Sequence, residues 1–303
     1  MGQTLSEPVT TKETSSCSNK LYKVASSCMQ GWRINMEDSH TEILSLREDK
    51  GTAFFGVYDG HGAKGNVPEA IKGGFLSCDT DMQKDEQMKD EMAGTTAIVV
   101  ILKNQKIYCG NVGDSRAIAS KKGVVEQLSY DHKPSNDDET RRIIAAGGWV
   151  EFNRVNGNLA LSRALGDFCF KKNDKKPAEE QIVTALPDVI QKDITPDHEF
   201  IVLACDGRYY ADNACIWDVL SNQEVLDFVR TRIAQQMQLE QICEELLTRC
   251  LAPDCQMGGL GCDNMTVIIV CFLQGGNYQE LSEKCSRPSD SSSFNGNSAP
   301  LYS

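Results

Sequence analysis

Short apolar runs and longer helical stretches alternate along the middle of the chain, between residues 20 and 275. Five runs of strand length are rich in β-branched or aromatic residues, which suit the pleated surface of a sheet. They cover residues 52–58, 95–102, 106–112, 200–205 and 265–272. Each is predicted to form a β-strand.

Three segments have the periodicity or the boundaries of helices. Residues 137–146 end at a Gly-Gly pair, which stops a helix. Residues 223–237 carry an apolar residue at every fourth position, and residues 239–251 end shortly before Pro253. Strands that come in adjacent pairs, followed by pairs of helices, predict an α+β sandwich rather than a regular βαβ wind.

The two ends of the chain lack such patterns. Residues 1–19 are rich in Ser and Thr and have no apolar periodicity, so they are predicted to form a flexible arm. Residues 276–303 are polar and rich in serine, and a disordered tail is predicted there. The folded domain is therefore expected over residues 20–275.

Composition limits the classes of function. The 303 residues carry a formal net charge of -12, which argues against a nucleic-acid partner because such proteins usually present a basic face to phosphate. No run approaches the ~18 apolar residues of a transmembrane helix, and no apolar signal-peptide core stands at the start. A cytoplasmic protein is expected.

Thirteen cysteines are scattered along the chain without any Cys-x-x-Cys pair. The closest group, Cys250, Cys255 and Cys262, has no histidine nearby, whereas thiolate zinc sites usually have tighter ligand pairs. In a reducing compartment we expect free and mostly buried thiols, with a metal or disulfide role as the alternative.

The first six residues match the pattern for N-myristoylation, in which Gly2 becomes the N-terminus and Ser6 completes the motif. An ordinary disordered start is the alternative. One acyl chain anchors a protein only weakly, and the neighbouring residues supply no basic patch. We therefore expect a cytoplasmic protein that is partly associated with membranes.

Several strand-like runs lead into acidic residues. Asp59 and Asp206 each follow a run directly and precede a glycine, and Asp263 comes just before another run. Glu37-Asp38 and Asp114, in Gly113-Asp114-Ser115, add to this set. A single Asp-Gly pair is most simply a turn. As a set, carboxylates at strand ends suit a metal site for two reasons. Mg²⁺ and Mn²⁺ prefer oxygen ligands, and a sheet holds the residues at its strand ends rigidly in place.

The order of these residues resembles that of the metal-dependent serine/threonine protein phosphatases, the type 2C family. Eight strings carry the resemblance, at residues 31–38, 55–62, 94–97, 113–116, 131–134, 158–167, 203–207 and 263–266. The resemblance implies a four-layer sandwich of two antiparallel β-sheets flanked by α-helices. It also implies hydrolysis of phosphoserine and phosphothreonine in phosphoprotein substrates by a metal-activated water.

The resemblance implies a metal site in a cleft at one end of the sandwich, with two Mg²⁺ or Mn²⁺ ions per chain and a third ion as a further option. The ligands of the two ions would be Glu37, Asp59, the carbonyl of Gly60, Asp206 and Asp263. Asp114 resembles the ligand of a third, looser ion, and Asp38 resembles a residue that holds metal-bound water.

Two further residues acquire roles from the resemblance. Arg33 would grip the substrate phosphate with its planar fork of donors, and His61 would donate a proton to the departing serine or threonine oxygen. The other three histidines are expected to be structural.

The chain departs from the family pattern twice. Some two dozen residues that the family has after Gly62 are missing, and Arg208 to Cys215 are inserted before Ile216-Trp217-Asp218. These departures favour an alternative, a catalytically weak pseudophosphatase that acts as a phosphoprotein-binding module, while the complete set of carboxylates favours the active enzyme. Hydrolysis of a different phosphate ester is a third reading. A monomer is expected.

Overall fold

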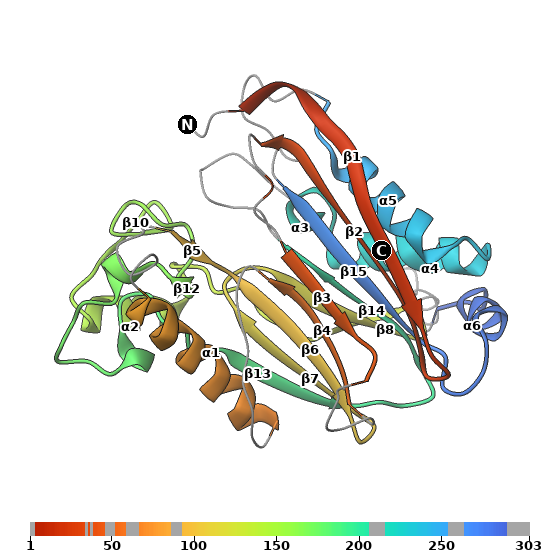
Figure 1. Ribbon diagram of the computed structural model, residues 1–303, viewed down its shortest axis with the longest axis horizontal. Coiled ribbons are helices and arrows are strands. Elements are labelled where there is room, and N and C mark those ends of the chain that lie inside the picture. The colour runs from red at the N-terminus through yellow and green to blue at the C-terminus, as the bar shows by residue number, and fades with distance from the viewer. Residues whose placement is uncertain are drawn as a thin grey trace, which may run out of the picture.

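The computed structural model describes residues 4–33, 36, 39–45, 52–58, 67–85, 93–205, 216–253 and 264–289. Two antiparallel sheets dominate this part of the chain (Figure 1). The six-stranded sheet has the order β1 (Thr4–Ser18), β2 (Tyr22–Arg33), β15 (Met265–Phe272), β14 (His198–Ala204), β8 (Arg116–Lys121) and β9 (Val124–Gln127). The five-stranded sheet has the order β13 (Asp188–Asp193), β7 (Lys106–Val112), β6 (Ala97–Lys103), β4 (Ala53–Tyr58) and β3 (Ser39–Ile43).

Shorter elements complete the described structure. Two small antiparallel pairs join β5 (Gly94–Thr95) to β12 (Leu165–Gly166) and β10 (Val150–Glu151) to β11 (Arg154–Val155). The helices are α1 (Val67–Lys84), α2 (Asp137–Ala145), α3 (Ile216–Val219), α4 (Asn222–Ala234), α5 (Leu239–Cys250) and α6 (Tyr278–Cys285). Single 3-10 turns lie at Phe168–Phe170 and Ala178–Glu180. None of the described helices combines the length and the apolar character of a membrane-spanning segment.

Apolar side chains between the two sheets form the central core. Phe55 and Ile98 of the five-stranded sheet pack in the same buried cluster as Leu203 and Ile268 of the six-stranded sheet. Every residue of β14 and β15 is buried, because both faces of these central strands are covered. Such strands read as continuous apolar runs rather than alternating ones.

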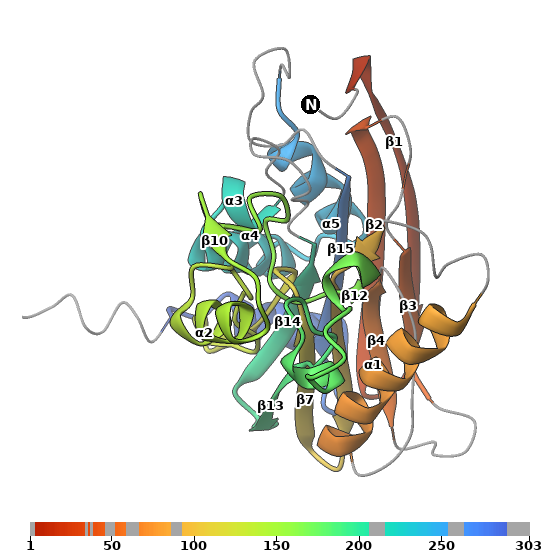
Figure 2. The same cartoon turned by 90° about the vertical axis from the view of Figure 1, so that its left-hand side faces the viewer.

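Helices cover the outer faces of both sheets and give the sandwich four layers. On the outside of the six-stranded sheet, α4 and α5 bury apolar residues such as Val229 and Leu246 against it. On the outside of the five-stranded sheet, α1 packs Ile71 and Phe75 against β6 and β7. Figure 2 shows α1 on one side of the sheets and α4 on the other. The predicted α+β, four-layer sandwich is confirmed.

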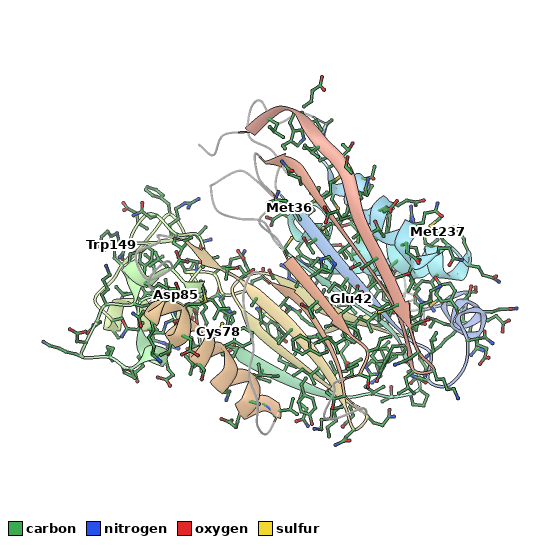
Figure 3. All side chains as sticks on the ribbon, in the orientation of Figure 1. Met36, Glu42, Cys78, Asp85, Trp149 and Met237 are labelled. Carbon is green, nitrogen blue, oxygen red and sulfur yellow. The ribbon has the colours of Figure 1, made fainter. Side chains whose placement is uncertain are left out.

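Polar contacts join the two sheets beside β1, through Glu42 of β3, which Figure 3 labels. Glu42 of β3 accepts hydrogen bonds from Ser15 Oγ (3.5 Å) and Cys17 Sγ (3.7 Å) of β1. Burial of Cys17, together with the nearby Glu42 carboxylate, raises the pKa of this thiol to about 11. None of the ten cysteines among the described residues forms a disulfide, and most of the ten are buried.

The strands and helices predicted within residues 52–272 are confirmed to within about three residues at each end. The prediction of a flexible arm over 1–19 is wrong for Thr4–Ser18, which forms β1. This polar segment is ordered by its ladder with β2 and by contacts with α5, where Thr14 Oγ1 donates to Glu244 Oε1 (2.6 Å) and Ser16 Oγ donates to Glu240. This segment has no apolar periodicity, and hydrogen bonds to the neighbouring strand and helix hold it in place instead of apolar burial.

The prediction of a disordered tail over 276–303 is wrong for Tyr278–Cys285, which form α6. Asn277 caps this helix by accepting a hydrogen bond from Glu280 N (3.0 Å). Leu281 and Cys285 are buried against α4 and the six-stranded sheet. Residues 290–303 lie outside the described part of the chain.

Candidate active site

Strand ends from both sheets meet at one end of the sandwich. β7 leaves the five-stranded sheet at Val112, and β8 enters the six-stranded sheet at Arg116 only four residues later. In the first sheet, Val112 lies in register with Ala97, Ala97 with Tyr58 and Tyr58 with Ser39. In the second, Arg116 lies in register with Ala204, and Ala204 with Val267. The C-terminal ends of β4, β7 and β14 therefore share this end with the N-terminal ends of β3, β8 and β15.

Hydrogen bonds tie the described strand ends together at this point. Cys205 N donates to Thr266 O (3.3 Å), which joins the end of β14 to the start of β15. Asn264 Nδ2 donates to Gln30 O (2.7 Å), which joins the start of β15 to the end of β2. The ends of β2, β14 and β15 are thus held together by direct contacts.

Most of the predicted site residues lie outside the described part of the chain. These are Gly2, Glu37, Asp38, Asp59, Gly60, His61, Asp206 and Asp263, and of Arg33 only the backbone is described, as the last residue of β2. The described strands nevertheless border three of them: β4 ends one residue before Asp59, β14 ends two residues before Asp206, and β15 begins two residues after Asp263.

Asp114 is the predicted ligand whose side chain the structure describes. It lies in the connection from β7 to β8 and is 1% exposed. Its Oδ2 accepts a hydrogen bond from Lys133 Nζ at 2.7 Å. A buried carboxylate needs such a partner, because an unpaired charge in the interior is costly.

The segment containing Lys133 is fixed beside Asp114 by its neighbours. His132 N donates to Gly113 O (2.9 Å), and Gly113 N donates to His132 Nδ1 (3.1 Å). Because Nδ1 accepts, a ring proton lies on Nε2, which faces Asp188 Oδ2 at 3.2 Å. This hydrogen bond from His132, together with the charge of Arg163, holds the pKa of Asp188 well below its ordinary value.

Arg116 and Asp131 form a second ion pair at the same end. Arg116 Nε and Nη2 donate to the two oxygens of Asp131 at 2.9 and 2.7 Å. The guanidinium also lies over the ring of Trp217, 5.3 Å from its centroid, which joins β8 to α3. The sequence alone assigned no role to Lys133, Arg116 or Asp131. Lys133 and Asp131 belong to the string at 131–134 and Arg116 to the string at 113–116, and both strings contributed to the resemblance without an assigned function for these residues.

Beyond this end, a buried carboxylate organises α2 and the loops around it. Glu139 accepts hydrogen bonds from Arg142 Nη1 (2.7 Å) and Arg163 Nη2 (2.8 Å), and also from the hydroxyl of Ser162. Burial favours the protonated acid, but these arginines outweigh burial and lower the pKa of Glu139 to about 2. Arg163 also donates to Asp188 Oδ1 (2.8 Å), so this network reaches the partner of His132.

A second buried cluster joins α1 to β12 and contains one lysine and two carboxylates. Asp79 Oδ1 accepts hydrogen bonds from Gly166 N (2.7 Å) and Lys171 Nζ (2.6 Å). Asp167, which is 2% exposed, lies near both. Burial and the charge of Asp79 raise the pKa of Asp167 to about 6, against the opposing effect of Lys171.

The raised pKa of Asp167 predicts a pH-dependent loss of stability. The unfolded chain releases this proton near the ordinary aspartate pKa of 3.8, and the folded chain near 6. Stability from the protonated form is therefore present below about pH 4 and is lost as the pH rises through about 6. Asp167→Asn should raise the free energy of unfolding at pH 7.5 by about 1–3 kcal/mol. Asn tolerates the left-handed backbone at this position (φ 51°).

Urea unfolding of the two proteins at pH 4, 6 and 7.5 measures this difference. The variant should gain stability over the wild type as the pH rises, while Asp174→Asn, at an exposed carboxyl nearby, should change nothing. A variant that is less stable at pH 7.5 would show that the ionised carboxylate of Asp167 stabilises the fold through Lys171, which would contradict a raised pKa.

The chemistry of the donor set fits a hard divalent cation. Glu37, Asp59, Asp114, Asp206, Asp263 and the carbonyl of Gly60 all offer oxygen atoms, which Mg²⁺ and Mn²⁺ prefer. Within the described residues no group of three or more histidines, cysteines or acidic residues could hold a metal ion. Of the predicted ligands, Asp114 alone lies among those residues, so the proposed site as a whole falls outside them.

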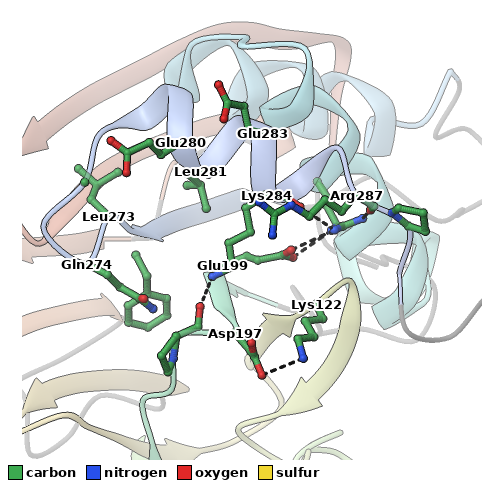
Figure 4. A pocket seen from close by; sticks show the side chains of 15 residues that line it. Lys122, Asp197, Glu199, Leu273, Gln274, Glu280, Leu281, Glu283, Lys284 and Arg287 are labelled. Atoms are coloured by element: carbon green, nitrogen blue, oxygen red, sulfur yellow. Dashed lines mark hydrogen bonds and ion pairs between the residues drawn. The ribbon is translucent and has the colours of Figure 1, made fainter.

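A hollow with a cavity volume of about 660 Å³ lies at the opposite end of the sandwich (Figure 4). Four of its charged lining residues form two ion pairs. Arg230 Nε donates to Glu199 Oε2 (3.0 Å), and Lys122 Nζ lies 3.2 Å from Asp197 Oδ2. It lies far from the strand ends that lead into the predicted ligands.

Comparison with known proteins gives the same family for this arrangement. The family model described as Protein phosphatase 2C matches residues 62–257. A probable protein phosphatase 2C of Caenorhabditis elegans is 61% identical over 95% of this chain and 85% of its own length. The chain belongs to the protein phosphatase 2C family. Protein phosphatase 2C homolog 2 of Schizosaccharomyces pombe is a further relative, 47% identical over 92% of this chain and 81% of its own.

Solved structures agree on the fold. A crystal structure of a phosphatase from Toxoplasma gondii superposes with a TM-score of 0.72 at 24% identity, covering 86% of this chain and 96% of that one. As a protein phosphatase 2C, the chain is a protein serine/threonine phosphatase, and its substrates are phosphoproteins. The alternative of a pseudophosphatase is not supported, since these relatives carry phosphatase names.

Proposed function

We propose that this protein phosphatase 2C hydrolyses phosphoserine and phosphothreonine with the help of two Mg²⁺ or Mn²⁺ ions and a third, looser one. The ligands of the two ions are Glu37, Asp59, the carbonyl of Gly60, Asp206 and Asp263, and Asp114 is the ligand of the third. The observation that carries the proposal is that β4, β14 and β15, which border three of these carboxylates in the sequence, share one end of the sandwich with the buried Asp114.

In this proposal the residues of the chain bind and orient the substrate. Arg33, at the end of β2, holds the phosphate through two parallel hydrogen bonds from its guanidinium. Asp38 accepts a hydrogen bond from the attacking water, and His61 donates a proton to the leaving serine or threonine oxygen. When bound, the metal ions polarise the phosphate and lower the pKa of the attacking water.

Phosphate release from a phosphothreonine peptide tests the proposal directly. The purified chain should be active in millimolar Mn²⁺ or Mg²⁺, inactive in excess chelator, and active again after metal is restored, because hard-ion sites of this type exchange readily. Full activity in excess chelator would contradict metal dependence. A folded chain that binds the phosphopeptide but releases no phosphate would support the binding-module reading.

We also propose that Gly2 is N-myristoylated and that the chain is a monomer in the cytoplasm with weak membrane association. The support for the lipid is the motif from Met1 to Ser6. Gly2→Ala should shift the membrane-bound fraction of the protein to the soluble fraction on fractionation of cells. Because one acyl chain binds weakly, the wild type should divide between the two fractions. Equal distribution of both proteins would count against acylation.

A further inference from the structure

Lys133 lies between two carboxylates at the end of the sandwich where the strand ends meet. Its Nζ donates to Asp114 Oδ2 at 2.7 Å and lies 3.7 Å from Asp131 Oδ2. All three side chains are largely shielded from solvent, with 18% of Lys133, 2% of Asp114 and 13% of Asp131 exposed. One of these two carboxylates is the proposed ligand of the third metal ion, and the other has no such role.

The two carboxylates differ in how they are held. Asp131 is held by hydrogen bonds from Nε and Nη2 of Arg116, at 2.9 and 2.7 Å, and these bonds do not involve Lys133. The backbone of the lysine segment is also fixed, because His132 and Gly113 exchange hydrogen bonds in both directions. The ammonium group on its long stem is therefore the part of this cluster that can move from one carboxylate to the other.

A divalent cation and an ammonium group compete for a single buried carboxylate. Both cannot contact the Asp114 carboxylate without strong repulsion between them, since solvent screens charges poorly in this enclosed position. An ammonium that leaves Asp114 also needs a new partner, because an unpaired buried charge is costly. Asp131 supplies that partner within 3.7 Å.

We propose that Lys133 competes with the third metal ion for Asp114 and moves its ammonium toward Asp131 when that ion binds. The inference rests on the metal-dependent function proposed above. Lys133 is thus a positioning residue that sets the affinity of the third ion. Its competition gives a physical reason for that ion to be the most loosely held.

Calorimetric titration of Mn²⁺ into the full-length chain tests this competition without any measurement of activity. Lys133→Met removes the charge and keeps much of the apolar stem, so the weakest Mn²⁺ should bind about tenfold more tightly than in the wild type. Asp114→Asn should abolish this binding event, and adding Lys133→Met to Asp114→Asn should not restore it. Lys106→Met is the matched control, because Lys106 pairs with Asp193 (2.5 Å) at the far end of β7 and should leave all Mn²⁺ affinities unchanged.

Each result decides between competition and another role. A folded Lys133→Met variant that binds the weakest Mn²⁺ with unchanged affinity would overturn the proposal. Weaker binding would also overturn it and would show that Lys133 holds Asp114 in place for the metal. If Lys133→Met fails to fold, Lys133→Gln makes the same comparison. If neither variant folds, Lys133 is required for folding, and this would overturn the proposal that a metal ion displaces its ammonium group from Asp114. If the wild type bound no Mn²⁺, the metal-dependent function itself would fail, whereas normal wild-type binding with an unchanged variant would overturn this inference alone.

Discussion

Asp206→Asn and Asp263→Asn should each reduce phosphothreonine hydrolysis by about 10³-fold or more. Each substitution removes one negative oxygen atom from the proposed ligand set, and an amide is a poor ligand for a hard divalent cation. Metal ions supply several kcal/mol of transition-state stabilisation, and each 1.36 kcal/mol is a factor of about ten in rate. Initial rates of phosphate release at saturating Mn²⁺ measure the loss.

Asp197→Asn is the matched control for Asp206→Asn. Asp197 precedes the opposite end of β14, is 40% exposed and pairs with Lys122, so the same change of charge there should leave the rate unaffected. Circular dichroism of the variants shows whether the fold is kept. A folded Asp206→Asn protein with wild-type rate would remove this residue from the metal site.

The sheets could be predicted from the sequence because their central strands are almost wholly apolar. β14 and β15 are buried on both faces and stand out as continuous runs such as Phe200–Ala204. β1 could not be predicted in this way, because it is an edge strand whose polar side chains pair with β2 and α5. The eight-residue helix α6 is too short for a periodic pattern to emerge, although Leu281 and Cys285 are spaced one turn apart.

The proposed ligands could be found from the sequence because each stands beside a strand or in a recognisable string. The side-chain pairs that hold the described part of the site together could not be found from the sequence. Lys133 and Asp114 are 19 residues apart, and Arg163 reaches Glu139 across 24. Such pairs form only after the loops between β7, β8 and α2 have folded, so nothing local in the sequence marks them.

The insertion at Arg208 to Cys215 is compatible with the fold on both sides of it. Trp217 is 5% exposed, and its Nε1 donates to Ala204 O at 2.9 Å, so the chain after the insertion is bonded to the end of β14. The two anchor points of the loop are therefore close, and closing a loop over a few extra residues costs little additional entropy. The segment after Gly62 likewise leads into a full helix, α1, which covers part of the five-stranded sheet.

His61→Ala should slow hydrolysis of a phosphoserine peptide by about 10²–10⁴-fold if His61 is the general acid. A serine alkoxide is a poor leaving group, so the transition state needs a proton on the departing oxygen. An aryl phosphate has a leaving group that is stable without this proton, and its hydrolysis should fall far less. The ratio of kcat values for the two substrates, measured in wild type and variant at the same Mn²⁺ concentration, isolates the proton transfer from substrate binding.

His61→Gln separates proton donation from hydrogen bonding in the same experiment. Glutamine can donate a hydrogen bond but cannot release a proton at neutral pH. It should therefore lose about as much activity as alanine on phosphoserine and again little on the aryl phosphate. Equal losses on both substrates would assign His61 to support of the site's geometry, and recovery of the phosphoserine rate in His61→Gln would mean that a hydrogen bond alone is enough. Either result would require another group to protonate the leaving oxygen.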